Sequence, residues 1–189
     1  MLLSLTLIAL VASLSLALVN NATKGPIEEV NKQKRTNAVA NVLPKDKDYT
    51  LGTDTVSVET EKGTLELIRY RATDNDGNLV GTAVKSYDNN GFGGKLGAMV
   101  GFDADGIISG YEVLESAETP GLGAKADKWF QADGKGCVIG KSPVNDKLTV
   151  TKDGGSVDAI TGSTITSRAF CRLVDAAYKA TLIEKGGNE

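Results

Sequence analysis

The first residues of the chain form an apolar run that few environments can accommodate. Residues 1–19 carry no charge, and the run is broken only by hydroxyl side chains, at Ser4, Thr6, Ser13 and Ser15. A helix of this length reaches ~28 Å at ~1.5 Å per residue, close to the ~30 Å hydrocarbon thickness of a bilayer. The run lacks the polar face of a core helix, and neither a preceding Lys or Arg nor a clear A-x-A site marks it as a signal peptide. We therefore predict one transmembrane helix over residues 1–20.

The segment that follows, residues 21–44, is predicted to be a juxtamembrane helix and linker. Residues 20–26 are interpreted as a break, with Pro26 in the first turn of a second helix over residues 27–43. The charged side chains of this second helix indicate a solvated spacer. The positive-inside tendency would keep this flank cytoplasmic, because basic residues follow the apolar run at Lys24, Lys32, Lys34 and Arg35. Since no charge precedes the apolar run, we expect the native start to lie upstream of Met1.

Residues 45–189 are predicted to form one α+β domain with antiparallel strands and a C-terminal helix. From Thr55 the sequence becomes rich in alternating apolar residues, interrupted by turns of Asn, Asp and Gly. The predicted strands pair as two hairpins, 64–71 with 79–87 and 96–102 with 107–114. The turn at 103–106 resembles the start of a calcium loop, but no acidic ligand completes it, so we expect a hairpin turn. A short helix over 124–130 is expected to place its two aromatic residues in the core.

The composition excludes several kinds of chemistry. A formal net charge of −3 and a pI near 5.1 give no reason to expect nucleic-acid binding. The absence of histidine removes the usual general base, the commonest haem ligand and most catalytic zinc sites. Two cysteines, Cys137 and Cys171, cannot hold an iron–sulfur cluster without other ligands. Either a single disulfide or two separate buried thiols would account for them.

Hydroxyl side chains cluster around Gly162, directly before the last helical segment. Residues 158–167 read DAITGSTITS, and from Arg168 onward apolar residues recur at helical spacing. The hydroxyls therefore lie at a helix N-terminus, where free N–H groups and the helix dipole favour a phosphate. Ser and Thr are also the preferred N-caps, so a capped helix without a ligand is the alternative.

Two glycine-rich segments precede this cluster. The first, residues 91–95 (GFGGK), is either a tight turn or a place where backbone approaches a planar ligand. The second, residues 118–123, reads ETPGLG. Its Pro-Gly pair predicts a defined turn that presents Thr119 and Leu122 from a rigid loop.

Two of these segments resemble those of a known family. Residues 158–164, D-x-x-T-G-S-T, are similar to the D-x-x-[ST]-G-A-T motif of FMN-binding domains whose flavin is joined to the protein through a phosphoester. Residues 118–123 match the family's E-T-P-G-L-G loop. Such domains occur in the G subunit of Rnf electron transport complexes and in the C subunit of the sodium-pumping NADH:quinone reductase. The resemblance implies that Thr164 carries the FMN phosphate, while Ser163 places a second hydroxyl where the family usually has alanine.

The resemblance also implies which residues surround the cofactor. Glu118 and Thr119 would supply polar contacts to the isoalloxazine ring, Leu122 would supply an apolar one, and Glu118 and Lys125 are candidates for setting its potential. The other residues of the implied FMN site are Asp158, Thr161, Gly162, Ser163, Thr166 and Gly123. The resemblance implies no catalytic base and no metal.

The implied function is electron relay in a membrane complex that moves electrons between reduced ferredoxin and NAD⁺ and translocates Na⁺ or H⁺. Partners would be the other membrane subunits and a flavin transferase that uses FAD. The compact domain favours the Rnf G subunit over the quinone-reductase subunit, which typically carries a longer insertion. The family places its flavin domain on the outer face of the cytoplasmic membrane, against the positive-inside tendency. A tethered binding module without flavin is the alternative from another class, and a free-standing flavin reductase is disfavoured because no G-x-G-x-x-G follows a predicted strand.

Overall fold

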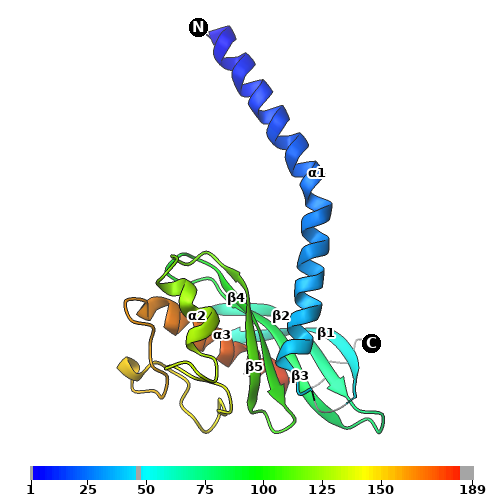
Figure 1. The fold of residues 1–189 in the computed structure, drawn as a ribbon, viewed down its shortest axis with the longest axis vertical. Helices are drawn as coiled ribbons and strands as arrows, with labels where there is room; N and C mark the ends of the chain where they lie inside the picture. Colours follow the sequence, from blue (N-terminus) through cyan, green and yellow to red (C-terminus); the bar gives the residue numbers. More distant parts are fainter. Residues whose placement is uncertain (1, 46–47, 184–189) are drawn as a thin grey trace. The chain divides into compact units, whose positions relative to one another are not determined.

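The computed structural model describes residues 2–45 and 48–183 and divides into two compact units, Met1–Thr36 and Asn37–Glu189. The first unit is the larger part of one helix, α1 (Leu2–Val42), shown at the blue end of Figure 1. Among the described residues, α1 is the one helix long and apolar enough to cross a membrane, because it contains an 18-residue window with a mean hydropathy of 1.9 that is fully exposed. These are the properties that a single membrane anchor requires.

The break that we predicted at residues 20–26 is wrong, because α1 continues through Pro26. A proline removes the helix hydrogen bond to the carbonyl four residues earlier, and residue 22, which carries that carbonyl, is exposed to solvent. The preceding turn is reinforced by Thr23, whose hydroxyl donates to the carbonyls of Val19 (2.8 Å) and Asn20 (3.3 Å). Losing one bond therefore does not end a helix of 41 residues.

The last turn of α1 belongs to the second unit, so our interpretation of residues 27–43 as a solvated spacer fails at its end. The buried residues there are at most 3% exposed, namely Ala38, Val39, Val42 and Leu43. They pack against Met99 and Ala83 on one face of the sheet. Val42 fits closely because the sheet presents Gly101, where a Cβ atom would overlap the Val42 carbonyl. A small residue in the strand thus creates the space that the helix end fills.

The sheet is an antiparallel meander in the order β1-β2-β3-β4-β5. Its strands are β1 (Thr50–Thr60), β2 (Gly63–Thr73), β3 (Leu79–Asp88), β4 (Leu96–Asp103) and β5 (Ile108–Ser116). Both predicted hairpins are confirmed, β2 with β3 and β4 with β5. The 103–106 segment is the expected turn, in which the Asp103 carboxylate accepts the N–H groups of Asp105 (3.0 Å) and Ile107 (2.8 Å). The β-structure begins at Thr50, five residues earlier than we predicted.

The C-terminal helix α3 (Thr164–Leu182) covers the other face of the sheet and makes the main core. Along β4, Ala98, Val100 and Phe102 face α3, whereas Met99 faces the end of α1, as the alternation of a strand requires. The short helix α2 (Ala126–Trp129) follows the 3-10 turn η1 (Gly123–Lys125), where a helix was expected. Of its two aromatic neighbours, Phe130 is fully buried and Trp129 is half-buried against the same core.

Candidate functional site

The first glycine-rich segment forms a tight turn that packs on the second. Gly91 and Gly94 exchange backbone hydrogen bonds of 2.9 and 3.3 Å, and Gly94 has a φ of 108°. A Cβ atom at Gly91 would overlap Glu118 Oε1, and one at Gly93 would overlap the carbonyl of Ala117. Glycine is therefore needed here for close approach to the neighbouring loop. We call residues 91–94 the glycine turn.

The second segment, residues 118–123, is the predicted rigid loop. The Thr119 carbonyl accepts hydrogen bonds from the N–H groups of Leu122 (3.1 Å) and Ala124 (3.2 Å), and Gly121 takes a φ of 77°. The loop leaves Thr119 exposed and Leu122 43% exposed, so both side chains are presented as expected. Glu118 differs, because its side chain turns inward and the residue is only 8% exposed.

The hydroxyl cluster lies at the start of α3, as predicted, with Ser163 in the N-cap position. Ser167 fixes the approach to the helix, since its Oγ accepts the Ile160 N–H and donates to the Ser163 carbonyl, both at 2.9 Å. Gly162 makes the turn with a φ of 80°. Ser163 forms no side-chain capping bond. The capped-helix alternative therefore lacks the bond that would define it, and the first-turn amides can still meet an anion.

The three segments meet at Glu118. Thr166 Oγ1 in the first turn of α3 donates to Glu118 Oε2 at 2.9 Å. Gly123 lies against both groups, because a Cβ atom there would stand 2.5 Å from Glu118 Oε2 and 2.6 Å from Thr166 Oγ1. A Cβ at Gly162 would stand 3.5 Å from Leu122 Cδ2. Motifs far apart in the sequence thus form one site.

Other predicted residues stand at the edge of this site. Asp158 contributes its carbonyl, which accepts the Trp129 Nε1–H at 2.8 Å, while the residue itself is exposed. Thr161 and Lys125 are exposed as well. Within the described residues, neither side chain hydrogen-bonds to another predicted site residue. Their role toward a cofactor stays a prediction.

One polar atom indicates what the site could hold. Glu118 Oε1 is buried and has no hydrogen-bond partner among the described residues. Buried polar atoms are nearly always paired, so this acceptor calls for a donor from a ligand. The edge of a flavin ring carries such a donor, and its faces are apolar. Exposed apolar side chains are available at Leu122 and Ile165, which are 43% and 48% exposed. The residues present therefore fit FMN.

Thr164 is the first residue of α3 and is half-buried, whereas Ser163 is only 7% exposed. Thr164 Oγ1 accepts a 3.5 Å hydrogen bond from Lys152 Nζ. Lys152 lies in the 3-10 turn η2 (Thr151–Asp153), and Arg168 binds Asp153 through two bonds of 2.7 Å. The hydrogen bond and charge of Arg168 hold the pKa of Asp153 below its usual value. Lys152 was not identified from the sequence, because it lies outside the motif at 158–164 and no pattern links it to Thr164.

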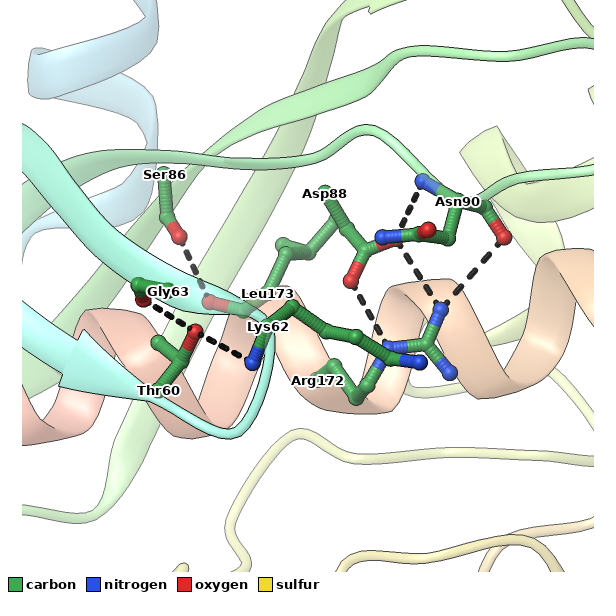
Figure 2. Close-up of polar contacts among 8 residues, drawn as sticks. All are labelled: Thr60, Lys62, Gly63, Ser86, Asp88, Asn90, Arg172 and Leu173. Atoms are coloured by element: carbon green, nitrogen blue, oxygen red, sulfur yellow. Dashed lines mark hydrogen bonds and ion pairs between the residues drawn. The ribbon is translucent and has the colours of Figure 1, made fainter.

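A second ion pair fixes the glycine turn and was also missed. Figure 2 shows Arg172 of α3 with Asp88 and Asn90 at the end of β3. Arg172 donates to the Asp88 carboxylate at 2.7 and 3.0 Å and to the Asn90 carbonyl at 3.4 Å. These groups form part of a groove of about 690 Å³ along α3, which none of residues 118–123 lines.

The two cysteines are free in this structure. Cys137 is half-buried, and Cys171 lies on α3 with its side chain buried in the main core. Burial raises the pKa of the Cys171 thiol to about 12. Of the two alternatives left open by the sequence, the structure therefore has the separate thiols, and Cys171 is protonated near neutral pH.

Comparison with known proteins supports the combination of motifs. The FMN-binding domain family matches residues 91–179. The G subunit of the Na⁺-translocating ferredoxin:NAD⁺ oxidoreductase complex of Acetobacterium woodii is 38% identical over 184 residues, covering 93% of this chain and 87% of the relative. The G subunit of the ion-translocating oxidoreductase complex of Methanosarcina acetivorans is 32% identical over 179 residues, covering 94% and 89%.

Among solved structures, the crystal structure of Shewanella oneidensis NqrC aligns with a TM-score of 0.46 and 21% identity, over 72% of this chain and 65% of that one. The sequence relatives confirm the family that the two motifs indicated. The chain therefore belongs to the G-subunit family of Rnf-type ion-translocating oxidoreductase complexes and carries an FMN-binding domain.

Proposed function

We propose that this chain is an electron-relay subunit with one FMN joined through its phosphate to Thr164. The observation that carries the proposal is Glu118 Oε1, which is buried without a hydrogen-bond partner among the described residues. It lies beside the start of α3, where Gly91, Gly93 and Gly123 leave no room for a Cβ atom. A ring donor would complete the hydrogen bonding of Glu118. The phosphate would meet the helix N-terminus and Lys152 at Thr164.

Attachment requires an enzyme, because a threonine hydroxyl is a weak nucleophile on its own. In the proposed step, Thr164 Oγ attacks the phosphorus on the FMN side of FAD, and a new P–O bond forms. The P–O bond to the AMP half breaks, AMP leaves, and the hydroxyl proton passes to a base of the transferase. Ser163 is the neighbouring hydroxyl, but its 7% exposure makes it the less accessible acceptor.

A covalently held flavin suits a relay subunit because the cofactor cannot leave an exposed domain. FMN supplies the redox chemistry, and the chain's own groups tune it by hydrogen bonds and charge around the ring. We propose that residues 1–20 anchor the chain and that 21–44 follow as a juxtamembrane segment whose last turn packs on the sheet. We propose further that 45–189 form the flavin domain on the outer face of the cytoplasmic membrane. By analogy with the Acetobacterium woodii relative, electrons pass between ferredoxin and NAD⁺ through partner membrane subunits, and the chain is not catalytic alone.

Intact mass tests this proposal most directly. The full chain is produced with and without a flavin transferase, and in-gel flavin fluorescence is read after denaturation. A transferase-dependent gain of one FMN less one water, retained in Ser163→Ala and lost in Thr164→Val, is expected. Loss in Ser163→Ala alone would move the attachment site. If no variant and no wild-type sample carries flavin, the domain is a tethered binding module instead.

A further inference from the structure

We propose that Arg172 is a positioning residue for the flavin environment: through Asp88 and Asn90 it holds the glycine turn against Glu118. This inference rests on the proposed function, since it takes FMN to lie beside Glu118. Four hydrogen bonds join Arg172, Asp88 and Asn90, and Gly91, the next residue, lies against the Glu118 carboxyl group.

The first contacts fix the backbone just before the glycine turn (Figure 2). Asp88 Oδ1 accepts the Asn90 N–H at 2.7 Å, and Arg172 Nη2 donates to the Asn90 carbonyl at 3.4 Å. The Asp88 side chain is only 8% exposed, and the bidentate guanidinium holds it at the end of β3. Both peptide groups of Asn90 are therefore tied to one ion pair.

The next contacts run from that backbone to Glu118. Gly91 directly follows Asn90, and a Cβ there would overlap Glu118 Oε1. On its other side, Glu118 meets Gly123 and Thr166. The carboxyl group thus lies between the glycine turn and the first turn of α3. Thr166 and Arg172 belong to the same helix. Helix α3 therefore binds the Glu118 carboxyl group directly through Thr166 and positions the glycine turn through Arg172.

The ion pair between Arg172 and Asp88 stays charged at neutral pH. Burial alone would raise the pKa of Asp88, but the hydrogen bond and charge of Arg172, together with the Asn90 N–H, lower it below its usual value. The bond to Asp88 correspondingly raises the pKa of Arg172. Both groups therefore remain charged at neutral pH, where a planar guanidinium can make the two parallel bonds that a lysine cannot.

Loosening this support has a consequence that can be measured at the flavin. With the glycine turn free, water reaches the Glu118 carboxyl group and screens its charge from the ring. A negative charge disfavours the electron-rich reduced flavin, so screening it raises the midpoint potential. We expect a change of about tenfold in the ratio of oxidised to reduced FMN at a fixed potential, or ~30 mV for a two-electron couple.

The experiment uses full-length protein produced with the transferase, as wild type and as Arg172→Met, Arg172→Lys and Asp88→Asn. The matched control is Lys179→Met, which breaks the exposed 2.8 Å pair between Lys179 and Asp175 on the same helix. FMN content is read by intact mass, the midpoint potential by spectroelectrochemical titration, and backbone opening by amide hydrogen exchange over residues 89–95.

Unchanged FMN content, a raised potential and faster exchange over 89–95 in all three variants, with the control at wild-type values, are expected. If Arg172→Met folds poorly, Arg172→Lys and Asp88→Asn decide, because both keep the size of the side chain. Flavin-loaded variants with wild-type potential and exchange overturn the inference while leaving the proposed function intact. A wild-type protein without FMN overturns the proposed function instead.

Discussion

Thr166 Oγ1 donates a 2.9 Å hydrogen bond to Glu118 Oε2, and this single bond joins two motifs that lie 48 residues apart in the chain. Thr166 is fully buried and Glu118 is 8% exposed, so neither group has ready access to bulk water. The bond uses one carboxyl oxygen and leaves the other, Oε1, directed away from any described partner. At Oε1 a hydrogen-bond donor would therefore be favoured over a negatively charged group.

Replacing Glu118 by glutamine should raise the midpoint potential of the bound FMN. The amide keeps the size of the side chain and can still accept the Thr166 hydroxyl, but it removes a negative charge beside the ring. We expect a change of about tenfold in the ratio of oxidised to reduced FMN at a fixed potential, or ~30 mV for a two-electron couple. Spectroelectrochemical titration measures this shift. Glu115→Gln is the control, since that exposed carboxylate pairs with Lys85 and Lys95. A flavin-loaded Glu118→Gln protein with wild-type potential would show that the ring lies elsewhere.

Replacing Lys152 by glutamine should slow attachment of the flavin. Its ammonium lies 3.5 Å from Thr164 Oγ1, where an incoming phosphate adds negative charge. Because the pair is exposed, we expect a decrease of about threefold to fivefold in the initial rate, measured by intact mass over time with purified transferase. The difference from wild type should shrink as salt is added.

Two further variants isolate the contribution of Lys152. Lys147→Gln removes a charge from the neighbouring exposed segment and should leave the rate unchanged. Arg168→Met releases Asp153 and the turn that carries Lys152, so it should slow attachment in the same direction. Equal rates for Lys152→Gln and wild type would remove Lys152 from the phosphate site.

Acid should weaken the fold partly through Asp88. Its pKa is lower in the folded chain than the ordinary aspartate value of about 3.9, so its contribution to stability is fully present above that value. The contribution is lost as the pH falls through the folded pKa, because the unfolded state then binds the proton more readily. Between about pH 6 and pH 3, the free energy of unfolding in urea should fall more for wild type than for Asp88→Asn. Asp175→Asn, at an exposed pair, should follow the wild type.

Local patterns in the sequence were sufficient for much of this structure. The hairpins follow from strand alternation with Asn, Asp and Gly turns, and the start of α3 follows from hydroxyls before an amphipathic repeat. The continuous α1 was missed because a single proline signals a helix end locally, whereas a long exposed helix tolerates one lost bond.

The site residues divide in the same way. The two motifs led to Glu118 and Thr164 as proposed site residues, because both lie in short contiguous segments of the sequence. Lys152, Arg168 and Arg172 could not be identified in this way. Each contacts a partner that lies near it only in the folded chain. Arg172 is separated from Asp88 by 84 residues, and nothing in either segment indicates the pairing.

Arg69 of β2 also contacts partners far away in the sequence, and replacing it should destabilise the whole domain. The side chain is fully buried, binds the Asp54 carboxylate through Nε and Nη2, and donates from Nη1 to the carbonyls of Ala180 and Ile183 at the end of α3. The C-terminal carbonyls of a helix have no helical partners and carry partial negative charge, so a buried cation stabilises them.

In Arg69→Met, Asp54 and both carbonyls lose this donor together, and breaking a buried pair from one side costs about 3–5 kcal/mol. Urea unfolding of the flavin-free chain should show that loss at neutral pH. Arg71→Met is the matched control, since the neighbouring arginine is half-buried and, within the part of the chain that the structure describes, its side chain donates only to the Ile183 carbonyl, at 3.2 Å. Arg71→Met should lower the free energy of unfolding clearly less than Arg69→Met does. Equal losses in the two variants would mean that the end of α3 is held by apolar packing, and that the buried guanidinium only fills space.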